Sequence, residues 1–106
     1  MHAHAGDPML TDVNEAAKKT AQLLSTECEQ LQIELRLDLE PNLPSVRIDI
    51  ERLRQVLINL IRNSMQALAS SGSITVQTRS RDRVQSSAQR RDWIELAVID
   101  SSPEYR

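Results

Sequence analysis

With 106 residues the chain can form one domain, and its core must be aliphatic because it holds no Phe, one Trp and one Tyr. A formal net charge of -2 excludes the strongly basic surface that nucleic acids or anionic membranes attract. The lone Cys28, expected as a small packing residue, excludes an internal disulfide, and no apolar run approaches the roughly 18 residues of a membrane span. We therefore expect a cytoplasmic protein in a reducing compartment.

The N-terminal residues 1–10 are small and broken by a glycine and a proline, which predicts a disordered tail. The remaining residues, 11–106, are then a single domain. Thr11 or Asp12 can cap a first helix that runs to about Gln30, because small and apolar residues recur there at helical spacing.

A strand is predicted next, since the stretch from Ile33 to Glu40 alternates strictly between apolar and charged residues. Pro41 and Pro44 end this strand because proline cannot donate a hydrogen bond to the ladder. The apolar residues within 46–48 can add a second, very short strand.

A second helix is predicted from the residue after Asp49, its N-cap, to about Leu68, since apolar residues recur at helical spacing. The helix should stop near residues 69–73. There Gly72 can supply the positive φ of a helix-ending turn.

The last third of the chain predicts two strands. Residues 73–80 are β-branched and alternate, with Ile74 and Val76 toward the core, and residues 93–100 are densely apolar, which favours a central position. Between them the polar residues 81–92 predict an extended hairpin loop. The order of elements predicts an α/β, or α+β, fold: a two-layer sandwich of two helices on a small mixed sheet of three to four strands.

Two asparagines interrupt the apolar run of the second helix. Asn59 and Asn63 are four residues apart, so they project about 40° apart from one face, with Gln55 and Gln66 on neighbouring turns. Amides donate and accept hydrogen bonds, and their carbonyl oxygens suit Mg²⁺, which takes few protein ligands and binds phosphates. Periodicity alone leaves open the alternative that both are border residues bonded to nearby backbone or water.

The segment from Leu43 to Leu68, LPSVRIDIERLRQVLINLIRNSMQAL, resembles the N-box that opens the nucleotide site of sensor histidine kinases, which belong to the GHKL ATPase superfamily and have the Bergerat fold. The strand before it and the two strands after it resemble the family's neighbouring segments in the same order, so the resemblance covers roughly residues 11–100. It implies Mg-ATP as cofactor, a role in two-component signal transduction, and a histidine kinase or response regulator as partner.

The resemblance also implies the roles of single residues. Asn63 matches the asparagine that binds Mg²⁺ between the nucleotide phosphates, and Asp100 matches the aspartate that accepts a hydrogen bond from the adenine amino group. Asn59 matches the N-box position that is a general-base glutamate in hydrolytic relatives; no catalytic role is assigned to it, because an amide is a poor proton acceptor. Arg62 and Gln66 would approach the phosphates or the substrate domain.

The family pattern breaks off after Asp100. The family continues as Asp-x-Gly-x-Gly, whereas here Asp100 is followed by SSPEYR, with Ser102 and Glu104 in place of the glycines that let the backbone approach a nucleotide. The family's lid and second glycine-rich box have no counterpart, because the only glycines are Gly6 and Gly72, and no helix carries a phosphoacceptor histidine. The chain therefore resembles a truncated or degenerate ATP-binding domain.

We expect weak or no nucleotide binding and no phosphoryl transfer by the chain alone, since phosphate binding draws on several loops. The alternative is an interaction module: the family's sheet continues past residues 93–100, and an unpaired edge there would favour self-association or docking on a kinase. Nucleic-acid binding through the arginines around residues 81–92 is disfavoured, because aspartates dilute them and no aromatic residue lies between them.

Overall fold

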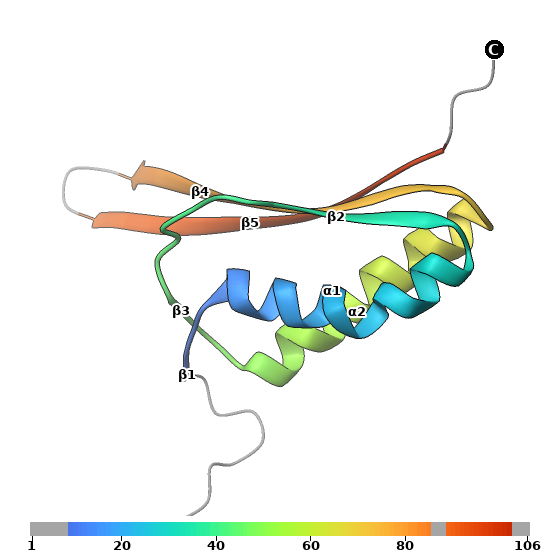
Figure 1. Cartoon of the computed structure of the whole chain (residues 1–106). Coiled ribbons are helices and arrows are strands. Elements are labelled where there is room, and N and C mark those ends of the chain that lie inside the picture. Colours follow the sequence, from blue (N-terminus) through green and yellow to red (C-terminus); the bar gives the residue numbers. More distant parts are fainter. Residues whose placement is uncertain (1–8, 86–88, 103–106) are drawn as a thin grey trace, which may run out of the picture.

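The computed structural model describes residues 9–85 and 89–102 (Figure 1). In chain order the elements are β1 (Met9–Thr11), α1 (Val13–Gln30), β2 (Ile33–Leu39), β3 (Val46–Ile48), α2 (Ile50–Leu68), β4 (Gly72–Gln85) and β5 (Gln89–Ser101). Both helices lie against one face of the main sheet (Figure 1). The predicted α+β two-layer sandwich is confirmed. Neither helix in the described part of the chain is long and apolar enough to cross a membrane.

The main sheet has the strand order β2-β4-β5 and is mixed. β2 is parallel to β4, from Ile33 opposite Gly72 to Leu39 opposite Thr78, and β5 is antiparallel to β4. The prediction that residues 93–100 form a central strand was therefore wrong, because β4 is central and β5 lies at the edge. The apolar density of β5 comes from residues on both faces; on the face away from the helices, Ile99 is 48% exposed.

A separate pair of short strands holds the start of the domain. β1 pairs antiparallel with β3, with Met9 opposite Ile48 and Leu10 opposite Arg47. The Thr11 hydroxyl donates a 2.9 Å hydrogen bond to the carbonyl of Ile48. The predicted tail was therefore wrong for its last two residues, while residues 1–8 lie outside the described residues.

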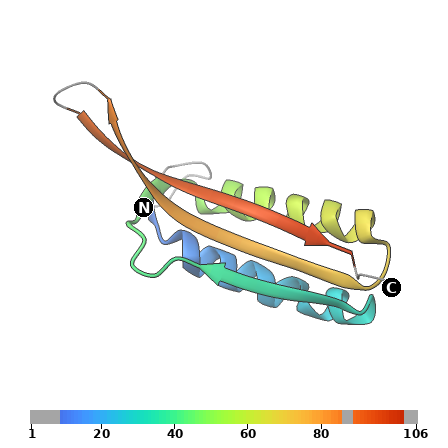
Figure 2. The same cartoon turned by 90° about the horizontal axis from the view of Figure 1, so that it is seen from above.

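The polar stretch 81–92 was predicted as a loop, and this was wrong for its described parts. β4 and β5 pair continuously from Ser73 opposite Ser101 to Gln85 opposite Gln89. Beyond Thr78, where pairing with β2 ends, the two strands continue as a ribbon past the helices (Figure 2). Strands that no second layer covers need no apolar face, so their sequence is polar and resembles a loop.

The predicted helix starts are confirmed, and one predicted end is not. The N-cap carboxylates of Asp12 and Asp49 accept hydrogen bonds from the backbone N–H of Glu15 and Glu51. α2 ends at Leu68, and the residue that adopts positive φ at its C-cap is Ala69, with φ 63°. Gly72 instead opens β4.

Aliphatic side chains fill the space between the layers, as the composition predicted. The fully buried side chains include Leu24 of α1, Leu57 and Ile61 of α2, and Ile74 and Val76 of β4. Cys28 is buried among them. Burial, with a smaller contribution from the neighbouring charge of Glu27, raises the pKa of the Cys28 thiol, which suits a packing residue rather than a nucleophile.

Candidate functional site

The helix that carries the N-box residues has two different flanks beside its buried face. Its buried face holds Leu53, Leu57 and Ile61. On the flank toward α1, the Arg62 guanidinium forms a 3.1 Å ion pair with Glu27 of α1. Residues on the opposite flank therefore face away from α1, on the side where α2 borders β5 (Figure 2).

Asn63 belongs to this outer flank of α2, because it lies about 100° around the helix from Arg62 and away from α1. Both Asn63 and Asn59 are exposed. The same flank holds two exposed apolar side chains, Val56 at 49% and Leu60 at 38%. The sequence predicted Leu60 as part of the buried stripe; the structure leaves it partly open because nothing in the described part of the chain lies beside this flank.

Asp100 lies near the C-terminal end of β5. It is opposite Ile74, whose fully buried side chain faces the helices, and residues opposite each other in a ladder share a face. Asp100 itself is exposed. It therefore lies on the helix side of the sheet, at the same β5 edge that the outer flank of α2 borders.

The levels of these residues along the molecule also agree. A Cβ at Gly72 would meet both the Ser101 carbonyl and the Leu68 side chain, so the ends of β5 and α2 lie side by side. With about 1.5 Å per helix residue and about 3.3 Å per strand residue, Asn63 is about 7 Å back from Leu68 and Asp100 about 3 Å back from Ser101. The two candidate ligands border one stretch of the edge.

Arg62 and Gln66 do not join them. They line a separate hollow of about 440 Å³ between the C-terminal ends of α1 and α2, together with Glu27, Leu31, Met65 and Ala69. Spacing along the helix predicted one strip for the polar N-box side chains, but only the position of α1 decides that Arg62 is held on the other side.

A larger hollow of about 450 Å³ lies elsewhere, between the first turns of the two helices. Leu10, Lys19, Ile50 and Arg54 are among its lining residues, and none of the predicted site residues lines it.

No group of three His, Cys, Asp or Glu that could hold a metal ion occurs among the described residues. An exposed amide such as that of Asn63 fits the ion that the resemblance implies, because Mg²⁺ keeps most of its ligands from water and phosphate. His2 and His4 lie outside the described part of the chain.

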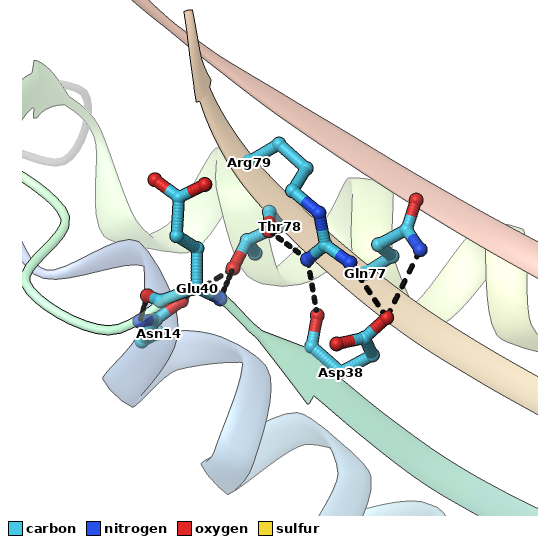
Figure 3. A network of polar contacts seen from close by, with 6 residues as sticks. All are labelled: Asn14, Asp38, Glu40, Gln77, Thr78 and Arg79. Carbon is cyan, nitrogen blue, oxygen red and sulfur yellow. Dashed lines mark hydrogen bonds and ion pairs between the residues drawn. The ribbon is translucent and has the colours of Figure 1, made fainter.

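A partly buried polar network, which sequence reasoning missed, lies at the opposite end of β2 (Figure 3). The Thr78 hydroxyl donates to the Asn14 side-chain oxygen at 2.8 Å and accepts from the Glu40 backbone N–H at 3.1 Å. The Asn14 amide donates to the Glu40 carbonyl at 2.7 Å, and the Glu40 carboxylate accepts from the Ser80 N–H at 3.1 Å. The available signal was Thr78, a hydroxyl at an inward position of an alternating strand.

An ion pair on the other face of the sheet adjoins this network. The Arg79 guanidinium lies 2.8 Å from the Asp38 carboxylate, which also accepts a 3.1 Å hydrogen bond from Gln77 (Figure 3). The hydrogen bonds from Arg79 and then Gln77 hold the pKa of Asp38 below its usual value. These contacts join β2 to β4 and stabilise the sheet; nothing in them resembles a ligand site.

Sequence relatives of the chain are sensor histidine kinases. It is 33% identical over 78 residues to the sensory histidine kinase/phosphatase NtrB of Klebsiella oxytoca, covering 73% of this chain and 22% of that protein. It is 37% identical over 65 residues to the sensor histidine kinase ZraS of Escherichia coli strain K12, covering 61% of this chain and 14% of that protein. The chain thus spans about a fifth or less of the length of these curated relatives. No protein-family model matches it.

Solved structures of histidine kinases share its fold. The kinase ThkA in complex with the response regulator TrrA aligns with a TM-score of 0.74 and 20% identity, over 92% of this chain and 27% of that chain. The catalytic domain of ThkA aligns with a TM-score of 0.72 and 22% identity, over 94% and 62%. ShkA in complex with AMPPNP aligns with a TM-score of 0.64 and 23% identity, over 70% and 16%.

The fold is thus that of a histidine kinase catalytic domain. Over most of its length the chain is homologous to the corresponding part of two-component sensor kinases.

Proposed function

We propose that this chain is a degenerate ATP-binding domain of a two-component sensor histidine kinase, which binds Mg-nucleotide weakly at most and transfers no phosphoryl group by itself. The observation that carries the proposal is the position of Asn63 and Asp100 at one edge, where the outer flank of α2 borders β5. In the family that the chain resembles, these positions bind the metal and the adenine.

Each residue has a role that its chemistry allows. The Asn63 side-chain oxygen would bind Mg²⁺, and the Asn59 amide one turn away would donate to a phosphate oxygen. The Asp100 carboxylate would accept from the adenine amino group. Arg62 would have to leave Glu27 to reach a phosphate, so we assign it and Gln66 only a secondary part in binding.

Weak binding follows from what the chain lacks. Nucleotide phosphates are normally held by several backbone N–H groups and cations from glycine-rich loops. The chain has two glycines, of which Gly72 is occupied in opening β4. Glu104, which the resemblance puts at a glycine position, lies outside the described residues.

A second function, protein docking, is favoured by the edge position of β5. Among the described strands only β4 pairs with it, so its other edge is open to a partner. The related ThkA was solved in complex with a response regulator, and we propose a regulator or a complete kinase as the partner of this chain.

A Mg-ATP titration followed by amide NMR tests the nucleotide proposal. We expect saturable shifts at Asn59, Asn63 and Asp100 at millimolar nucleotide, and at least about tenfold weaker binding in Asn63→Ala and Asp100→Ala. Gln22→Ala, on the exposed side of α1, is the matched control and should bind like the parent.

Two outcomes would contradict the proposal. Absence of any saturable shift would remove the nucleotide site, whereas phosphoryl transfer above a protein-free blank would show that the domain is not degenerate.

A further inference from the structure

The open edge of β5 is unusual in composition as well as position. The segment Ile94–Ile99 holds one charged residue, Glu95, and no proline. Natural edge strands are commonly protected from pairing by charges, prolines or bulges. Glu95 gives little protection, because its carboxylate lies 2.8 Å from the Arg81 guanidinium on the neighbouring strand β4.

An apolar floor extends beneath this edge. On the helix side of β5, Ile94, Leu96 and Val98 are only partly buried against the core. Val56 and Leu60 lie on the outer flank of α2, and counting back from the adjacent ends of the two elements places them about level with Leu96. Whatever pairs with β5 would therefore rest half of its side chains on this flank.

The position of α2 decides what kind of partner fits. Paired strands lie about 4.8 Å apart, whereas packed helices need about 8–10 Å between their axes. α2 lies at the β5 border of the sheet (Figure 2), so a second copy joined through its own β5 would bring two helices within about one strand spacing of each other. A strand with no helix beneath it avoids this clash.

We propose that the β5 edge and the outer flank of α2 together form an acceptor site for a single extended segment of another protein. The segment adds as an antiparallel strand, with apolar side chains at alternate positions facing Val98, Leu96 and Ile94. Its next inward position lies opposite Asp100, so a lysine or arginine there completes the match of charge. Main-chain hydrogen bonds give affinity, and the alternate side chains give specificity.

The probe that tests this is a nine-residue peptide of alternating threonine and valine, with lysine in place of the valine that would face Asp100. Fluorescence anisotropy of the labelled peptide gives the dissociation constant, and amide NMR without nucleotide locates the site. We expect saturable binding with shifts along Ile94–Asp100. A peptide with proline at its centre cannot complete the ladder and should bind at least about tenfold more weakly.

Two protein variants separate the floor from the rest of the surface. Leu60→Glu puts a charge beneath the added strand and should weaken peptide binding by at least about tenfold. Leu23→Glu, the same chemical change at a 58% exposed position of α1, should leave binding unchanged. Leu60 is itself 38% exposed, so the variant should stay folded, which circular dichroism checks.

The proposal is overturned by any of three results. These are no saturable binding at millimolar peptide, binding that tolerates the proline or the Leu60→Glu change, and a dimer in sedimentation velocity that excess peptide does not dissociate. Because no nucleotide is present, none of these results bears on Mg-ATP binding.

Discussion

The Thr78 hydroxyl of β4 donates a 2.8 Å hydrogen bond to the side-chain oxygen of Asn14 in the first turn of α1. This contact joins the two layers across 64 positions of sequence. Thr78 is fully buried, and its hydroxyl also accepts from the backbone of Glu40, where the chain leaves β2. One side chain therefore fixes the end of a strand, the start of a helix and the loop between β2 and β3.

Replacing Thr78 with valine keeps the shape but removes both hydrogen bonds. The Asn14 oxygen loses a partner in a partly buried place, so Thr78→Val should lower the free energy of unfolding by about 1–3 kcal/mol in urea titrations. Thr75→Val, at a half-buried position on the opposite face of β4, is the matched control and should change it by less than about 0.5 kcal/mol. Equal effects of the two substitutions would show that the network contributes nothing particular.

The hydroxyl of Thr20 gives the opposite expectation. Thr20 is 1% exposed on α1, and its oxygen has no hydrogen-bond partner among the described residues. Thr20→Val should therefore raise the free energy of unfolding by about 1 kcal/mol, since a buried hydroxyl without a partner costs free energy. Thr20→Ser keeps the hydroxyl and loses the methyl group, so it should be destabilising; stabilisation by serine would contradict the reasoning.

Two substitutions in the turn after α2 should have opposite signs. Gly72 has φ 127°, and a Cβ there would lie 2.6 Å from the Ser101 carbonyl oxygen, so Gly72→Ala should lower the free energy of unfolding by about 1–3 kcal/mol. Ala69 has φ 63° as a non-glycine residue, so Ala69→Gly should raise it by up to about 1 kcal/mol. Thermal unfolding of both variants, compared with the parent, tests the pair, and the same sign for both would refute it.

The pairing of Asp38 with Arg79 predicts a pH dependence. Hydrogen bonds from Arg79 and Gln77 lower the pKa of Asp38 in the folded state, so the folded chain binds the proton less tightly than the unfolded chain does. The resulting stabilisation is present above the unfolded-state pKa of about 3.9 and is lost as the pH falls through the folded-state pKa.

Asp38→Asn tests this pH dependence. In urea titrations from neutral to acid pH, the stability difference between parent and variant should shrink as the pH falls through this range. A difference that stays constant to the lowest pH would show that the ion pair does not contribute. NMR titration of the Asp38 carboxyl in the parent checks the direction of the pKa shift independently.

Local patterns predicted most of the elements for reasons that can be named. Alternation predicted β2, helical spacing predicted α1 and α2, and the short polar residues Asp12 and Asp49 predicted where the helices begin. The four-residue spacing of Asn59 and Asn63 likewise predicted that both lie on one side of α2.

The errors have one origin, which is that a local pattern does not record what lies beside it. Residues 81–85 are polar because no layer covers β4 there, not because they form a loop. Leu60 follows the helical spacing of the core but lies at the border of the packed layers. Arg62 is one residue from Asn63, and only the presence of α1 holds its side chain on the other flank.

By itself the sequence determined the elements, their caps, the aliphatic core and the similarity to a histidine-kinase N-box, because these depend on residue type and short-range spacing. Only the tertiary structure decided that β5 is an edge strand, that Asn63 and Asp100 border the same stretch of it, and that Thr78 and Asn14 are bonded. Those relationships depend on which distant segments pair and on which side a helix packs. The free energy that selects them comes from burial between the layers as a whole, and no single stretch of residues encodes it.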